Sequence, residues 1–270
     1  MYWDTFQKEG GFDFSTYQRN KALNTNLKHT YTKTGTTIVG ITFKDGIILG
    51  SDTRATNGDI VANLDCQKLH YLAPNIYCAG AGTAADLEKV SEMMASELEL
   101  HRLNTNRESR VSHVEARMCN HLFRYMGYIG CALIVGGIDC KGPHLVNITP
   151  YGNSTHLPFT TMGSGSLAAM SILETNYKDN MTEEEGISLV TKAIEAGIFN
   201  DEGSGSNVDL FIITKKGLKK LESYRSYNFK TYNTTKNYVF EKGLTPIIEE
   251  VKKNWNNVEV KNEKMEIEEL

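Results

Sequence analysis

The sequence lacks the features that would direct it to a membrane or to nucleic acid. Among its 270 residues there is no apolar run long enough to span a bilayer, and the opening MYWDTFQKEGGFDF has no cationic start followed by an apolar stretch. Basic residues are not in excess, since 29 Lys and Arg stand against 33 Asp and Glu, for a formal net charge of −4. Without a basic field, binding to nucleic acid is disfavoured. We expect a protein of an aqueous compartment, with no membrane and no nucleic-acid partner.

Cysteine is scarce and has no pattern. The five cysteines show neither Cys-x-x-Cys spacing nor a Cys/His cluster: Cys66, Cys78, Cys119, Cys131 and Cys140. This odd set indicates neither a disulfide framework nor a zinc site, so no metal is predicted. Reduced thiols fit the cytoplasm and nucleus best, and we expect the protein there.

Motifs of several common catalytic classes are also missing. No Gly-x-Ser-x-Gly elbow is present, and no motif points any of the seven histidines at a Ser or Cys. The two Gly-Ser-Gly-Ser stretches, 163–166 and 203–206, lack the Lys-Ser/Thr ending of a phosphate-binding loop. We therefore expect no such triad, no nucleotide site and no cofactor.

The remaining composition is that of a globular protein, with 40% hydrophobic and 23% charged residues, enough for one large domain or two small ones. Residues 1 to about 35 are polar without a sustained period and are predicted to be an extended or disordered leader. The periodicity that follows predicts a hairpin over 36–52, strands over 59–82, helices from 84 and over 110–127, a hairpin over 128–150, helices over 166–177 and 183–199, and strand from 207.

Strands that alternate with pairs of helices favour an α+β protein of two stacked antiparallel sheets with a helix pair on each outer face, a four-layer αββα sandwich. Thr182 and Glu185 form a capping box that opens the last helix. After about Glu222 the chain is rich in Lys, Asn and Glu. Composition favours a disordered tail there, and leaves open an arm that orders on a neighbour.

The stretch KTGTTIVG contains the strongest candidate for a nucleophile, Thr36. Thr36 and Thr37 follow Gly35, which is ordinary for the start of a strand. A Thr hydroxyl is a poor nucleophile unless a base takes its proton, and a chain-terminal α-amine, with a pKa of about 7.7–8.0, is such a base at neutral pH. Cleavage between Gly35 and Thr36 would give one residue both groups, whereas in the intact chain the nitrogen is an amide and cannot act.

Further segments raise this hypothesis above the ordinary interpretation: GSDTRAT, CQKLH, AGAGTAAD, TMGSGSLAAM and GIFNDEGSGSNVDL. With them, the stretch from Gly35 to about Tyr224 resembles the catalytic β-subunits of the core proteasome, most closely the trypsin-like type. The resemblance implies an N-terminal nucleophile hydrolase fold that works without a cofactor. It also implies three parts: a leader propeptide over 1–35, a catalytic domain over 36–222 and a C-terminal extension over 223–270.

The catalytic roles follow from the resemblance, position by position. Thr36 takes the place of the nucleophile, with Gly35 before the cleaved bond. Asp52 and Lys68 match a buried acid and lysine, where the cation would favour the deprotonated hydroxyl; a purely structural ion pair is the alternative. Ser164, Asp201 and Ser204 match residues that orient the terminal amine, although Gly-Ser turn chemistry also explains both serines.

Gly82 matches the donor of the oxyanion hole, beside a helix N-terminus. For substrate binding, Gly80 implies a deep pocket and Glu88 an acid at its base that pairs with Arg or Lys before the scissile bond. Taken without the resemblance, Glu88 is equally well a solvated residue in a first helical turn. The complete set of expected substrate-binding residues is Gly80, Glu88, Cys66, Ala55, Thr56 and Ala84.

The family also implies partners and leaves two alternatives. We expect other α- and β-subunits in stacked seven-membered rings, unfolded polypeptides as substrates, and an extension that embraces a neighbour. The alternatives are a non-catalytic structural β-subunit that keeps its leader, and an amidase of the wider N-terminal-nucleophile class.

Overall fold

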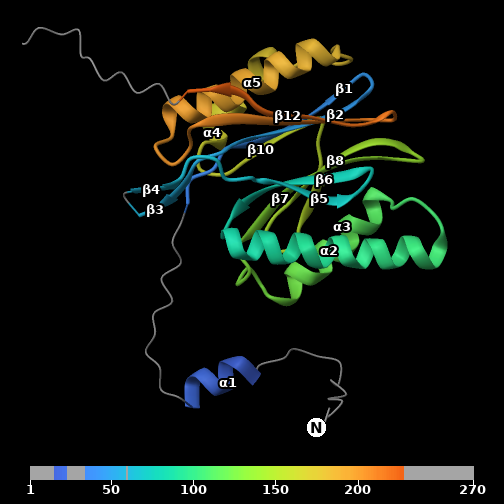
Figure 1. Cartoon of the computed structure of the whole chain (residues 1–270). Coiled ribbons are helices and arrows are strands. Elements are labelled where there is room, and N and C mark those ends of the chain that lie inside the picture. The colour runs from blue at the N-terminus through green and yellow to red at the C-terminus, as the bar shows by residue number, and fades with distance from the viewer. Residues whose placement is uncertain (1–14, 23–33, 59, 228–270) are drawn as a thin grey trace, which may run out of the picture. The chain divides into compact units, whose positions relative to one another are not determined.

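A computed structural model describes residues 15–22, 34–58 and 60–227 (Figure 1). Most of the expected leader, and the extension from residue 228 onward, lie outside the described residues. Among the described helices, none is long and apolar enough to cross a membrane.

The first sheet carries the segment that begins just after Thr37. Its antiparallel strands run in the order β10-β1-β2-β11-β12. The predicted hairpin is confirmed, with Phe43 paired to Gly46 around the turn. The strands are β1 Ile38–Phe43, β2 Gly46–Asp52, β10 Phe159–Met162, β11 Asn207–Thr214 and β12 Gly217–Ser226.

The second sheet is also antiparallel and runs in sequence order, β5-β6-β7-β8-β9. A separate two-stranded hairpin, β3 with β4, connects the first sheet to the second along the chain. The bounds are β3 Ala55–Asn57, β4 Ile60–Asn63, β5 Leu69–Ala73, β6 Ile76–Gly82, β7 Cys131–Asp139, β8 Gly142–Ile148 and β9 Ser154–His156.

Two pairs of helices cover the outer faces of the sheets (Figure 1). Helices α2 (Ala84–Thr105) and α3 (Val111–Arg124) pack on the second sheet, and α4 (Ser166–Asn176) and α5 (Glu183–Asn200) pack on the first. In α3, the residues at helical spacing that face the sheet are all buried: Val111, Val114, Met118 and Leu122.

A third apolar cluster lies between the sheets and includes Leu49, Ile134 and Phe211. The four-layer αββα sandwich predicted from the sequence is therefore confirmed. The capping box at the start of α5 is confirmed as well, because the Thr182 hydroxyl accepts from the Glu185 N–H while the Glu185 carboxylate accepts from the Thr182 N–H.

Three local expectations need correction. The leader contains a helix, α1 (Ser15–Ala22), where no regular structure was predicted; its Gln, Arg, Lys and Ala are good helix formers despite the lack of an apolar face. The first strand begins at Ile38, because the Thr36 and Thr37 main chains bond to the site described below. Strand β12 continues to Ser226, past Glu222, because Arg225 and Ser226 still pair with β11.

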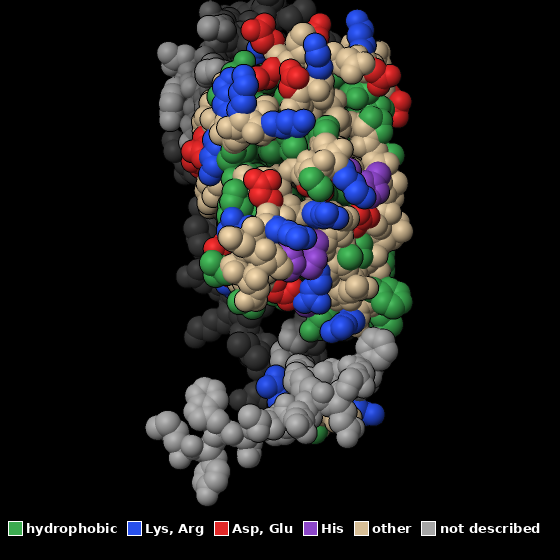
Figure 2. All heavy atoms as spheres, turned by 90° about the vertical axis from the view of Figure 1, so that its right-hand side faces the viewer, with side chains coloured by type: hydrophobic (Ala, Val, Ile, Leu, Met, Phe, Trp, Pro, Cys, Tyr) green, Lys and Arg blue, Asp and Glu red, His purple; other side chains and the backbone are tan. Residues whose placement is uncertain are grey.

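The surface carries both signs of charge. On the face shown in Figure 2, Lys and Arg side chains are interspersed with Asp and Glu over the described residues. No field of one sign covers that face, in agreement with the small net charge.

Candidate active site

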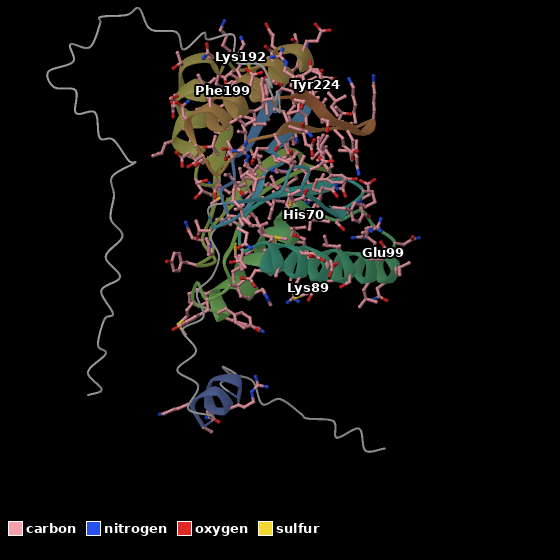
Figure 3. The ribbon with its side chains drawn as sticks, turned by 60° about the vertical axis from the view of Figure 1, so that its left-hand side comes forward. His70, Lys89, Glu99, Lys192, Phe199 and Tyr224 are labelled. Carbon is pink, nitrogen blue, oxygen red and sulfur yellow. The ribbon has the colours of Figure 1, made fainter. Side chains whose placement is uncertain are left out.

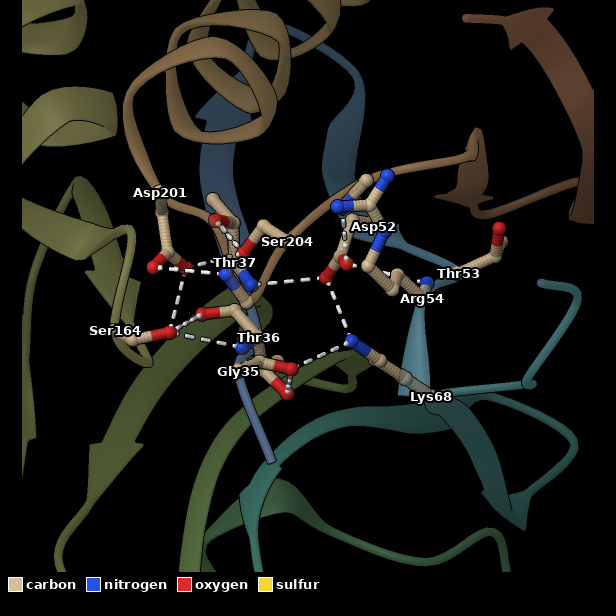
Figure 4. A network of polar contacts seen from close by, with 12 residues as sticks. Gly35, Thr36, Thr37, Asp52, Thr53, Arg54, Lys68, Ser164, Asp201 and Ser204 are labelled. Carbon is tan, nitrogen blue, oxygen red and sulfur yellow. Dashed lines mark hydrogen bonds and ion pairs between the residues drawn. The ribbon is translucent and has the colours of Figure 1, made fainter. Parts of the chain in front are cut away.

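Thr36 lies just before β1 and is almost fully buried, with 4% of its surface exposed. Its backbone N–H donates to Ser164 Oγ at 3.0 Å, and its own hydroxyl donates to the Gly35 carbonyl oxygen at 2.7 Å (Figure 4). The hydroxyl of Thr36 is thus placed beside the peptide bond that precedes it in the chain.

Two glycines leave room for this junction. A Cβ on Gly35 would lie 2.1 Å from the Gly203 backbone, so no larger residue fits at that position without a backbone shift. Gly163 has a φ of +97°, and a Cβ there would lie 2.1 Å from the Thr36 carbonyl oxygen. The close approach of three backbone segments around Thr36 therefore depends on glycine.

On one side of Thr36 lies a buried ion pair. The Lys68 ammonium donates to Asp52 Oδ1 at 2.8 Å, and the Asp52 side chain is fully buried. The backbone N–H of Thr37 donates to the same oxygen at 2.9 Å, and that of Gly205 donates to Asp52 Oδ2 at 3.1 Å. Because a buried carboxylate needs all its acceptor sites filled, these bonds fix the carboxylate and hold Lys68 in place.

Lys68 also contacts the residue before Thr36, because its ammonium donates to the Gly35 carbonyl oxygen at 3.2 Å. The same oxygen receives the Thr36 hydroxyl. A cation here polarises the Gly35 carbonyl and stabilises negative charge that develops on its oxygen.

On the other side of Thr36 lies a network of hydroxyl groups around Asp201. Both Ser164 and Ser204 donate to Asp201 Oδ2, at 2.6 and 2.7 Å. Ser204 Oγ also lies 2.7 Å from the Thr37 hydroxyl oxygen. Since the Ser164 hydrogen is directed at the carboxylate, a lone pair of Ser164 Oγ faces the Thr36 nitrogen.

A cavity of about 490 Å³ opens beside Thr36. Three of the predicted site residues line it, namely Thr36, Ser164 and the expected oxyanion donor Gly82. Among the described residues, no charged side chain lies in its wall, whose remaining members are Thr34, Ala81, Thr83, Gly127, Tyr128, Gly130, Ala132, Pro150 and Gly163. Thr36 and Gly82, the expected nucleophile and oxyanion donor, thus face one space.

The expected substrate-binding residues lie outside that cavity wall. Glu88, on α2, has a side chain 60% exposed, with Lys89 Nζ 3.6 Å from its carboxylate. A Cβ on Gly80 would lie 2.8 Å from the Leu87 side chain, so Leu87 packs directly against this glycine. The deep pocket expected at Gly80 stays a prediction.

The other expected substrate-binding residues lie in β3, at the start of α2 and in the connection between β4 and β5. Ala55 and Thr56 are half-buried in β3, and the Gly35 N–H donates to the Thr56 hydroxyl at 3.4 Å. Ala84 is the first residue of α2. Cys66 is partly buried, and its backbone N–H donates to the Thr53 carbonyl at 2.8 Å.

Burial shifts the pKa values of two titratable groups in the second sheet. Burial lowers the pKa of His70, on β5, while the nearby Glu88 carboxylate opposes that shift. Figure 3 shows His70 beside α2, the helix that carries Lys89. Burial raises the pKa of the Cys78 thiol to about 12, so this cysteine is no nucleophile at neutral pH. Over the described ranges, no three His, Cys, Asp or Glu side chains are grouped to hold a metal ion.

Comparison with known proteins shows the family of this chain. Residues 32–213 match the family described as "Proteasome subunit". The chain belongs to the proteasome subunit family. Its similarity to proteasome subunit beta type-7-B of Arabidopsis thaliana is 52% identity over 96% of both chains.

Other proteasome relatives show a comparable similarity. Proteasome subunit beta type-7 of Dictyostelium discoideum is 49% identical over 89% of this chain and 91% of the relative. Proteasome subunit beta type-10 of Bos taurus is 47% identical over 90% of both. The αββα sandwich is thus the fold of a proteasome β-subunit.

Several residues of the proteasome-type site were not singled out from the sequence. Thr37 and Gly205 bond to Asp52, the Arg54 N–H donates to Asp52 Oδ2 at 3.2 Å, and Gly163 packs on Thr36. The glycines carry a weak signal, since each lies in a Gly-Ser-Gly-Ser stretch. Thr37 and Arg54 carry none, because nearly every residue has a backbone N–H donor.

Proposed function

We propose that this chain is a threonine endopeptidase subunit of the core proteasome that cleaves unfolded polypeptides, preferably after basic residues, and that activates itself by cleavage between Gly35 and Thr36. The observation that carries the proposal is the position of the Thr36 hydroxyl, 2.7 Å from the Gly35 carbonyl oxygen in the wall of an open cavity. Family membership supports the endopeptidase class.

In the self-cleavage that we propose, Thr36 Oγ attacks the Gly35 carbonyl carbon. The new Oγ–C bond forms as the C–N bond to Thr36 breaks, and the hydroxyl proton passes to the Thr36 nitrogen. Lys68, 3.2 Å from the Gly35 oxygen, stabilises the charge that develops there. Water then hydrolyses the ester, releasing the leader with a Gly35 carboxylate and leaving Thr36 with its hydroxyl and a new amine.

The released amine of Thr36 then serves as the proton acceptor in peptide hydrolysis. The Thr36 hydroxyl attacks the substrate carbonyl carbon, and the amine takes the hydroxyl proton. As the peptide C–N bond breaks and an acyl ester forms on Thr36, the amine passes this proton to the departing peptide amine. Ser164 orients the amine, Asp52 holds Lys68, and the Gly82 N–H stabilises the oxyanion. Water cleaves the ester in the second half of the reaction. All these steps use residues of this chain and need no cofactor.

The preference for basic residues is proposed to come from Glu88. An exposed carboxylate on α2 pairs with a substrate Arg or Lys once a neighbouring subunit and the substrate enclose it. In the assembled particle, Glu88→Gln is expected to lower kcat/KM for a peptide ending in Arg about tenfold, with leader removal unchanged. Glu92→Gln, on the same helix, is the matched control. An unchanged ratio of Arg to Leu cleavage would remove Glu88 from the proposal.

Assembly and location are part of the same proposal. We propose that the subunit joins other α- and β-subunits in stacked seven-membered rings, that residues 223–270 embrace a neighbour, and that the particle works in the cytoplasm and nucleus. Relatives that are named proteasome subunits support assembly with such partners. The three-part division at 35 and 222 is proposed together with the self-cleavage.

The deciding experiment is N-terminal sequencing and intact-mass measurement of this chain from the assembled particle. The expected mature chain begins at Thr36. Thr36→Ala is expected to keep its leader and to lose cleavage of Arg peptides, whereas Thr175→Ala, at an exposed threonine of α4, is processed and active. A leader retained by the wild-type chain would favour a structural subunit, and activity on small amides alone would favour an amidase.

A further inference from the structure

Thr37 is the residue beside the nucleophile, and its side chain is completely enclosed. A Cβ on Gly165 would lie 2.0 Å from the Thr37 hydroxyl oxygen, and one on Gly197 would lie 2.4 Å from it. Gly165 caps α4 and Gly197 lies in α5. The hydroxyl is therefore held in a fixed place between two helices and cannot turn toward solvent.

The direction of its hydrogen bond follows from the acceptors around it. Asp201 Oδ2, as a carboxylate oxygen, only accepts, so Ser204 donates its one hydroxyl hydrogen there at 2.7 Å. Ser204 Oγ must then accept from the Thr37 hydroxyl, which lies 2.7 Å away. A chain of directed bonds thus runs from Thr37 through Ser204 to Asp201.

The same carboxylate oxygen receives Ser164, which in turn accepts the Thr36 N–H. Thr37 also contacts the ion pair on the other side of Thr36, because its backbone N–H donates to Asp52 Oδ1 at 2.9 Å. The same oxygen accepts from Lys68. One residue therefore bonds to the networks on both sides of Thr36 (Figure 4).

We propose that Thr37 is a positioning residue whose hydroxyl, acting through Ser204 and Asp201, sets the orientation of Ser164 toward the Thr36 amine. This inference rests on the proposed threonine-peptidase function. Without the Thr37 hydroxyl, Ser204 can rotate, Asp201 loses a fixed donor, and the Ser164 lone pair no longer faces the amine. The effect falls on the reactive geometry and leaves substrate binding unaltered.

The test uses the full chain in the assembled particle with Thr37→Val, which keeps the side-chain shape and removes the hydroxyl. We expect kcat for an Arg-ending fluorogenic peptide to fall about tenfold with KM unchanged, the size of one buried hydrogen bond. The acidic limb of the pH profile of kcat/KM moves to lower pH, because a less well-bonded ammonium gives up its proton more readily. Thr37→Ser restores both properties.

Thr191→Val is the matched control, since this buried threonine on α5 donates to the Ile187 carbonyl, within the same helix. It is expected to change neither kcat nor the pH profile. If the Thr37→Val chain does not assemble, Thr37→Ala is used instead, because its smaller side chain cannot clash in the site. The same fall in kcat and the same shift of the pH profile are expected.

The inference is overturned if a hydroxyl-free variant keeps wild-type kcat and pH profile, or if Thr37→Ser behaves like Thr37→Val. Thr36→Ala in the same assay separates this outcome from failure of the proposed function. Arg-peptide cleavage that survives Thr36→Ala refutes the function itself, whereas its loss together with an unaffected Thr37→Val refutes only the role of Thr37.

Discussion

The two carboxylates that flank Thr36 are held in opposite ways. Asp52 ends β2, is fully buried, and is neutralised by Lys68 and by backbone N–H groups. Asp201 follows α5 at its C-terminal end, is partly exposed, and is held by two serine hydroxyls. An acid at a helix C-terminus opposes the helix dipole, so Asp201 is placed there at a small cost in stability.

This difference indicates that Asp52 and Asp201 have different roles. A buried ion pair is rigid, and it becomes strongly unfavourable when one partner is removed. Hydroxyl groups around a partly solvated acid can reorient. The hydrogen bonds around Asp201 can therefore rearrange at a lower cost in free energy than the Asp52–Lys68 pair. We therefore expect substitutions on the Asp52 side to affect folding and chemistry together, and those on the Asp201 side to affect mainly chemistry.

The largest effect is expected for Lys68→Met. It leaves Asp52 as an unpaired buried charge, so the free energy of unfolding should fall by about 3–5 kcal/mol. Leader removal should stop as well, because the Gly35 carbonyl loses its cation. Urea unfolding of the full chain and intact mass in the particle measure the two effects. Lys89→Met, which breaks an exposed pair with Glu92, should leave the free energy of unfolding nearly unchanged, because solvent screens exposed pairs; equal losses in both variants would contradict the comparison.

A smaller effect, confined to activity, is expected for Asp201→Asn. Hydrogen bonds to a charged group contribute about 1.5–3 kcal/mol, so kcat should fall between about tenfold and a hundredfold while unfolding changes less than in Lys68→Met. Steady-state kinetics with an Arg peptide measure the loss. Asp179→Asn, in the exposed connection between α4 and α5, serves as the control. If Asp201→Asn destabilised the chain as much as Lys68→Met, the two sides would not differ as described.

The smallest effect is expected two residues beyond Lys68, at His70. Burial holds its pKa below the ordinary 6.5, so under acidic conditions the unfolded chain binds a proton more readily than the folded one. The contribution of neutral His70 to the free energy of unfolding is fully present above pH 6.5 and is lost as the pH falls through the lowered pKa. Urea unfolding at several pH values should show a weaker pH dependence below 6.5 for His70→Gln than for the wild-type chain. Identical slopes in the two chains would contradict the lowered pKa of His70.

Much of the fold could be predicted because its signals are local. Helical spacing from Val111 to Leu122 and the capping box of Thr182 each depend on a few neighbouring residues, and both were predicted correctly. Helix α1 was missed because it has no apolar face, and the short strands β9 and β10 were missed because three or four residues give no measurable period.

The sequence by itself indicated the order of the longer helices and strands and the four layers, and it singled out Thr36 through the resemblance to proteasome β-subunits, since a glycine followed by threonine is ordinary at a strand start. Only the tertiary structure decided that Thr37 bonds to both flanking networks and that Leu87 occupies the space beside Gly80. The contacts of Thr37 join residues 15 and 167 positions apart in the chain, and whether a hydrogen bond forms depends on distances of a few tenths of an ångström. Such distances are fixed by the packing of helices on sheets and leave no periodic pattern in the sequence.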